Sequence, residues 1–154
     1  MRRTSARVLT TIAAIIAVLA STMGVASAAT TRIDATFEET LPVTGSGVLV
    51  DGAIPGCDSP STSTGPVSVS TFRSLTIFSG DKTITCLDGS TIELSFFAVL
   101  RGCAASNRGA WVATGGTGAF ADARGAGRLT GTYPNGDGCT ATTVEDRYRG
   151  RIRT

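Results

Sequence analysis

The sequence contains no histidine. This absence excludes a Ser-His-Asp triad, a Cys-His catalytic pair and any histidine-ligated metal. The four cysteines form no Cys-x-x-Cys pair, so a four-cysteine zinc site lacks the clustered ligands that it needs. We therefore expect neither a metal nor a cofactor.

A strong charge of one sign is also absent. Beyond residue 28 the chain carries 11 basic and 12 acidic residues, with the excess of acids before residue 101 and the excess of bases after it. Phosphate binding favours a clearly basic domain. We therefore expect no nucleic-acid partner.

A hydrophobic run of membrane-spanning length is missing as well. Val8–Ala20 is apolar but shorter than the roughly 20 residues that a span requires. Arginines precede this run, and Ala26-Ser27-Ala28 follows it with the small residues that signal peptidase recognises. We predict a signal peptide over residues 1–28 and a secreted single domain over 29–154 without a membrane anchor; an uncleaved N-terminal anchor is the alternative.

The predicted mature chain is rich in Thr, Val, Gly and Ser and shows no helical periodicity, which is typical of a β-sandwich or a β-barrel. Turn signals include Ser79-Gly80-Asp81 and the hairpin at Asp88-Gly89. The Ser-, Pro- and Thr-rich segment 55–66 is predicted to be an exposed loop. The pattern predicts eight strands: 31–40, 46–54, 67–78, 82–87, 90–101, 109–115, 124–133 and 139–152.

Two of these segments show clear alternation. In segment 90–101, one face carries Ile92, Leu94, Phe96, Ala98 and Leu100. In the last segment, one face carries Val144, Asp146, Tyr148, Gly150 and Ile152, while arginines occupy the other. One apolar and one wet face are typical of a closed antiparallel sheet. We interpret the arginine row as a solvated outer face.

An even number of cysteines in an exported chain predicts two disulfides. If the strands alternate in direction, the second and fourth end near Cys57 and Cys86 at one end of the sheet. Cys103 and Cys139 then lie at the opposite end. Of the three pairings, only Cys57–Cys86 with Cys103–Cys139 keeps each bridge at a single end.

The most specific stretch is Gly115-Gly116-Thr117-Gly118-Ala119-Phe120, followed by Ala123-Arg124-Gly125 and a glycine-rich strand. A nucleotide-binding loop would open a helix, whereas a strand pattern follows here. We interpret this stretch as a compact turn after which Phe120 folds back as an apolar plug.

This motif resembles the signature of dirigent proteins and allene oxide cyclases, especially the secreted bacterial proteins with an allene-oxide-cyclase-like barrel. The resemblance implies an all-β fold, an eight-stranded antiparallel up-and-down barrel. Arg124 matches the arginine of the dirigent motif. Ala119 replaces a residue that can be acidic there, and Asp34 and Glu38 give no convincing match to the acidic residue of the first dirigent strand.

Three functions follow as expectations. The first is a secreted barrel, monomeric or a small homo-oligomer, that binds a small apolar or aromatic molecule in its lumen. The second is a cofactor-free cyclase or isomerase, and the third is a structural or cell-surface interaction protein. The candidate catalytic residues are Asp146 and Arg124, and the candidate ligand-binding residues are Trp111, Tyr148, Tyr133 and Phe96. A rim position for Asp146 beside an arginine, and plain core packing for the aromatic residues, are the alternatives.

Overall fold

The computed structural model describes residues 29–42 and 45–154, so the predicted signal peptide lies outside the described residues. The described residues form nine strands and one short 3-10 helix, η1 (Gly118–Phe120). The strands are β1 (Thr30–Thr40), β2 (Ser46–Ala53), β3 (Ser61–Thr64), β4 (Ser68–Phe72), β5 (Leu75–Thr85), β6 (Thr91–Arg101), β7 (Ser106–Thr117), β8 (Arg124–Thr132) and β9 (Thr143–Arg153).

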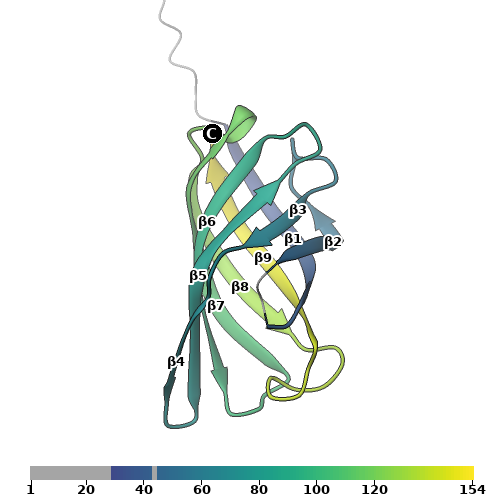
Figure 1. The fold of residues 1–154 in the computed structure, drawn as a ribbon. Coiled ribbons are helices and arrows are strands. Elements are labelled where there is room, and N and C mark those ends of the chain that lie inside the picture. The colour runs from purple at the N-terminus through teal and green to yellow at the C-terminus, as the bar shows by residue number, and fades with distance from the viewer. Residues whose placement is uncertain (1–28, 43–44) are drawn as a thin grey trace, which may run out of the picture.

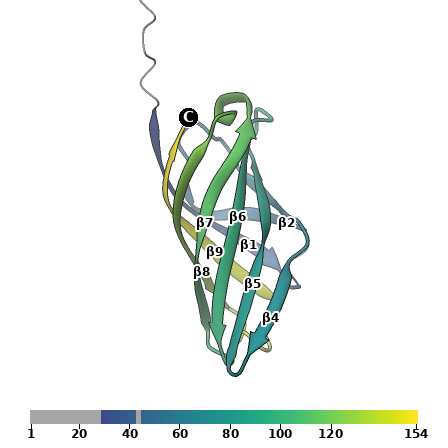
Figure 2. The ribbon, with the colours of Figure 1, turned by 90° about the vertical axis from the view of Figure 1, so that its left-hand side faces the viewer.

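Eight of these strands close into an antiparallel up-and-down barrel (Figure 1). From β5 to β9 each strand pairs with the next, β9 pairs with β1, and β1 pairs with β2. The short strand β3 then pairs with both β2 and β5 and completes the ring. The ninth strand, β4, lies outside the ring as a hairpin on β5 (Figure 2). The predicted all-β eight-stranded barrel is confirmed.

The count of eight is right, but two of the predicted elements are wrong. The predicted strand 67–78 is divided between β4 and the first half of β5 by a turn at Arg73-Ser74, and the predicted break at Ser79-Gly80-Asp81 lies inside β5. Those three residues pair with Ser95 to Phe97 of β6, and this ladder overrides the local turn propensity. The missing barrel strand is β3, which lies in the segment predicted to be a loop.

The two ends of the barrel differ in their filling. We call the end that holds η1 and the C-terminus the η1 end, and the opposite end, near the β4 hairpin, the β4 end (Figure 1). The large buried cluster includes Phe120 of η1 together with Ile33, Ile84, Ile92 and Ile152, each less than 4% exposed. A smaller cluster at the β4 end consists of Leu100, Tyr133 and Val144.

The turn that contains the motif depends on two glycines. Gly118 has φ +57°, in the left-handed region where other residues are strained. At Gly116 a Cβ atom would meet the backbone carbonyls of Thr91 and Phe120. These close approaches bring Phe120 back over the η1 end, where it is buried as predicted.

Both expected disulfides are present. Cys57–Cys86 joins the segment before β3 to the end of β5 at the η1 end. Cys103–Cys139 joins the β6–β7 connection to the β8–β9 connection at the β4 end. Two structural disulfides are typical of an oxidising, extracellular setting.

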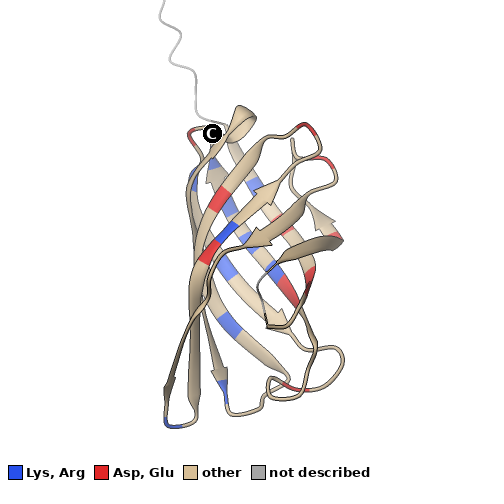
Figure 3. Ribbon diagram, viewed as in Figure 1, with Lys and Arg blue, Asp and Glu red and all other residues tan. Residues whose placement is uncertain are grey.

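The outer face of the barrel is polar along β8 and β9, where Figure 3 shows a concentration of basic residues. Arg147 and Arg149 bind the two carboxylate oxygens of Asp34 on the neighbouring strand, at 2.9 and 3.2 Å. The Arg147 guanidinium lowers the pKa of Asp34. The arginine row is thus an outer face, as predicted. None of the described residues form a helix long and apolar enough to span a bilayer.

Candidate functional site

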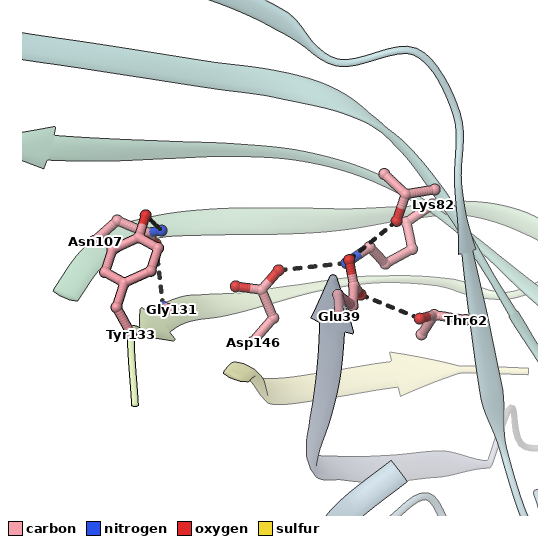
Figure 4. A network of polar contacts seen from close by, with 8 residues as sticks. Glu39, Thr62, Lys82, Asn107, Gly131, Tyr133 and Asp146 are labelled. Atoms are coloured by element: carbon pink, nitrogen blue, oxygen red, sulfur yellow. Dashed lines mark hydrogen bonds and ion pairs between the residues drawn. The ribbon is translucent and has the colours of Figure 1, made fainter. Parts of the chain in front are cut away.

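The interior of the barrel contains a charged side chain that the sequence alone did not bring to attention. Lys82, the only lysine in the chain, lies on β5 with its side chain fully buried. Its ammonium contacts Glu39 of β1 directly and lies 3.4 Å from Oδ2 of Asp146 on β9. Three strands that are far apart in the sequence therefore meet in one charge cluster, defined here as Glu39, Lys82 and Asp146 (Figure 4).

Glu39 is the best-satisfied member of the charge cluster. Besides Lys82, its carboxylate accepts hydrogen bonds from the hydroxyls of Thr62, at 3.1 Å, and Thr64, at 3.3 Å. Both threonines belong to β3, and both are buried. Alternation along the short strand points these two hydroxyls inward. The strand that closes the ring, β3, therefore also supplies hydrogen-bond donors to the buried carboxylate of Glu39.

Aromatic rings complete the surroundings of Lys82. Its nitrogen lies 5.5 Å from the centre of the Phe96 ring and 5.1 Å from that of Tyr148. A ring face attracts a cation, so these contacts replace part of the lost hydration. Even so, the charge cluster combines two acids with one base. Asp146, with a single contact to Lys82, is the less compensated acid, and burial raises its pKa while Lys82 opposes the rise.

A cavity of about 250 Å³ lies on the β4 side of the charge cluster. Its walls are mainly apolar and include Phe78, Phe96, Leu129 and Val144. Three lining residues are polar in character: Asp146, Asn107 and Tyr133. Binding sites for small molecules have this composition, with an apolar wall and a few placed polar groups.

Asn107 and Tyr133 form a second polar group on the cavity wall. The backbone N–H of Gly131 donates to Oδ1 of Asn107 at 3.1 Å, and Nδ2 of Asn107 donates to the Tyr133 hydroxyl at 2.8 Å. Burial raises the pKa of Tyr133, and so does the nearby charge of Asp146. In Figure 4, Asp146 lies between Lys82 on one side and the Asn107–Tyr133 pair on the other.

The structure brings together three of the six predicted site residues. Asp146, Tyr133 and Phe96 line the cavity. Tyr148 is fully buried beside Lys82, packs edge-to-face on Phe37 and does not line the cavity. Its hydroxyl has no hydrogen-bond partner within the described residues, and burial raises its pKa well above the usual value.

Trp111 also fills the interior without reaching the cavity. Its indole lies against the backbone of Gly127 and Gly150, where a Cβ atom would overlap the ring, and its Nε1 donates to the Arg128 carbonyl at 3.2 Å. The other candidate catalytic residue, Arg124, was expected to act inside the lumen, and this placement is wrong. Arg124 is exposed at the start of β8, and its guanidinium donates to the Ala123 carbonyl at 2.7 Å. On β8 the odd-numbered positions face inward, as buried Leu129 shows. Arg124 is at an even-numbered position and therefore faces outward.

Lys82, Glu39 and Asn107 were missed for identifiable reasons. Asn107 lies outside the predicted strand 109–115, because β7 begins at Ser106. The supposed break at 79–81 placed Lys82 at the very start of the predicted strand 82–87, although it lies well inside β5 and shares its face with buried Ile84. Glu39 shares its face with Ile33, Ala35 and Phe37, whereas Asp34 and Glu38, the acids noted on this strand, lie outward. Continuous alternation was the signal that could have placed Lys82 and Glu39 on the inner face, although not their contact with each other.

No model of a known protein family, no curated protein and no solved structure matches this chain. The interpretation of function therefore depends on the geometry of the barrel interior.

Proposed function

We propose that the protein binds a small, largely apolar molecule in the barrel lumen. The observation that carries this proposal is the cavity of about 250 Å³ at the β4 end, which has apolar walls and the buried carboxyl of Asp146 beside it. The η1 end is filled by the large core cluster, so the occupant enters from the β4 end. The two disulfides support a secreted protein that meets this molecule outside the cell.

The size of the cavity limits the occupant. An apolar cavity of about 150 Å³ holds benzene, so this cavity accommodates a molecule of roughly 10–15 heavy atoms. A monocyclic terpenoid or a substituted aromatic ring has this size.

Filling the cavity tests this proposal. Ala98 lies on the cavity wall, whereas Ala110 lies on the outside of the neighbouring strand β7. We expect Ala98→Leu to reduce binding of lipophilic molecules by about tenfold or more, because its added side chain occupies the space. The matched variant Ala110→Leu is expected to bind like the parent protein.

The measurement is mass spectrometry of small molecules that co-purify with the exported protein, followed by calorimetric titration of the molecule identified. Unfolding by urea checks that both variants are folded. Equal binding by the Ala98→Leu variant and the parent would remove the cavity as the site of binding.

A second candidate function is a cofactor-independent cyclase or isomerase, for which Asp146 supplies the support. A carboxyl with a raised pKa beside a ligand cavity is suited to proton transfer. The eight-stranded barrel agrees with the fold that the resemblance to allene oxide cyclases and dirigent proteins implies. Since Arg124 is outside, this function depends on Asp146 with Lys82 behind it.

Asp146→Asn distinguishes the two functions once the co-purifying molecule is known. If the protein is an enzyme, we expect the variant to lose turnover by at least about a hundredfold, because an amide cannot transfer the proton, while affinity changes by a few-fold. If the protein is a binder, the parent leaves the molecule chemically unchanged, and substitution alters affinity alone. Product analysis by mass spectrometry after incubation with each protein is the measurement.

A further inference from the structure

The hydrogen-bond directions on the cavity wall determine which chemical group the cavity recognises. The backbone N–H of Gly131 can only donate, so the side-chain atom of Asn107 that it contacts is the oxygen. This contact fixes the orientation of the amide. The Asn107 nitrogen therefore faces Tyr133 and donates to its hydroxyl oxygen.

The Tyr133 hydroxyl is consequently a free donor. Its oxygen already accepts the proton of Asn107, so its own proton has to be given elsewhere. No acceptor among the described residues takes it. The raised pKa of Tyr133 keeps the hydroxyl protonated.

Asp146 presents its second oxygen to the same space. Oδ2 faces the Lys82 ammonium, whereas Oδ1 accepts no hydrogen bond from the described residues and points towards the Asn107–Tyr133 side in Figure 4. Burial raises the pKa of Asp146. When the carboxyl is protonated, its proton lies on Oδ1, because Oδ2 faces a cation.

We propose that the occupant of the cavity is a neutral carbonyl compound, an apolar body whose carbonyl oxygen accepts a hydrogen bond from Tyr133, joined by one from Asp146 when that carboxyl is protonated. This inference rests on the proposed binding function and assigns its ligand class. A cationic ligand beside Asp146 would be opposed by Lys82, and an anionic ligand would find no unpaired cation in the buried space, because Lys82 is already paired with Glu39. A neutral acceptor fits the free donor of Tyr133 and brings no charge into the buried space.

Matched probes test the ligand class. We choose carvone, limonene and carvylamine, which share one ring skeleton and carry a ketone, no polar group and an amine, respectively. For the parent protein at pH 7 we expect carvone to bind about five- to tenfold more tightly than limonene, and carvylamine to bind more weakly than carvone. Isothermal titration calorimetry measures all three affinities.

The two tyrosines of the chain provide a variant and its control. Tyr133→Phe removes the donor, whereas Tyr148→Phe removes a buried hydroxyl that has no partner and does not line the cavity. We expect Tyr133→Phe to weaken carvone binding about five- to tenfold without changing limonene binding. Tyr148→Phe should change neither affinity.

The infrared carbonyl stretch of bound carvone is a second readout. A hydrogen bond lowers this frequency, so the band should move to a higher frequency in Tyr133→Phe and stay in place in Tyr148→Phe. Near-ultraviolet circular dichroism establishes that both variants are folded.

Three results would overturn the assignment while leaving lumen binding intact: equal affinities for carvone and limonene, tightest binding of carvylamine, or unchanged carvone binding in Tyr133→Phe. Failure of all three probes to bind the parent protein would instead reject lumen binding of a small apolar molecule, and the carbonyl assignment with it.

Discussion

Replacement of Lys82 by methionine is expected to lower the free energy of unfolding at pH 7 by about 3–5 kcal/mol. The side chain of Lys82 is fully buried, and it is the only cation in contact with the buried carboxyls of Glu39 and Asp146 within the described residues. Methionine has a similar length, so the loss reflects uncompensated charge and not an empty space. Urea unfolding followed by circular dichroism measures the difference.

This loss should depend on pH, with a sign that Asp146 determines. Its pKa is raised in the folded protein, so between the ordinary value of 3.8 and the raised value the folded state holds more protons than the unfolded state. Stability therefore falls as pH rises through that interval. Without Lys82, which opposes the rise in pKa, the interval extends upward. The loss caused by Lys82→Met should therefore be larger at pH 7 than at pH 4.

Two controls accompany this prediction. Arg151→Met removes an exposed cation from the outer face of β9 and should change stability by less than about 0.5 kcal/mol. The double variant Glu39→Gln with Lys82→Met should lose less than the sum of the two single changes, because the partners are removed together. A loss below about 1 kcal/mol for Lys82→Met would show that the charge cluster is not closed off from water as described.

Removal of either disulfide by paired Cys→Ala substitution is expected to cost about 3–4 kcal/mol of stability. The bridged cysteines are separated by 29 residues for Cys57–Cys86 and 36 residues for Cys103–Cys139, so each bridge restricts a long loop of the unfolded chain. The similar loop lengths predict similar losses. Urea unfolding of the two double variants provides the comparison.

The positions of the bridges predict a difference in binding. Cys103–Cys139 lies at the β4 end, where Gly138 beside it lines the cavity. Cys57–Cys86 is buried at the filled η1 end. Loss of Cys103–Cys139 should therefore weaken ligand binding at a temperature at which both variants are folded, whereas loss of Cys57–Cys86 should leave it unchanged. The reverse order would show that the ligand enters from the η1 end.

The division of the interior into a filled end and an open end has a functional consequence. The large core cluster fills the η1 end, and the charge cluster lies beside the cavity, which Asp146 lines. The proposed ligand binding at the β4 end therefore does not require the core to open. The chemistry of the site lies at the boundary, where Asp146 belongs to both the charge cluster and the cavity wall.

The local sequence determined which side chains of a strand face the interior. It also determined at which end of the barrel most strands stop. Alternation placed Phe96 and Asp146 inside because successive side chains of any strand point to opposite faces. The cysteines pair as expected because the prediction needed only the end of the barrel at which each cysteine lies. The errors in the strand boundaries between residues 55 and 81 leave each cysteine at its expected end. The motif glycines indicated the turn that buries Phe120.

Only the tertiary structure decided which partners these faces meet. The segment Ser61–Thr64 has little strand character of its own and becomes β3 because it is paired on both edges, by β2 and β5. The local propensity of Ser79-Gly80-Asp81 favours a turn. The segment is nevertheless part of a strand, because it pairs with β6. Lys82 joins Glu39 and Asp146 across separations of 43 and 64 residues, and no local pattern encodes a contact at that range. The charge cluster and the cavity beside it therefore arise only when the ring closes.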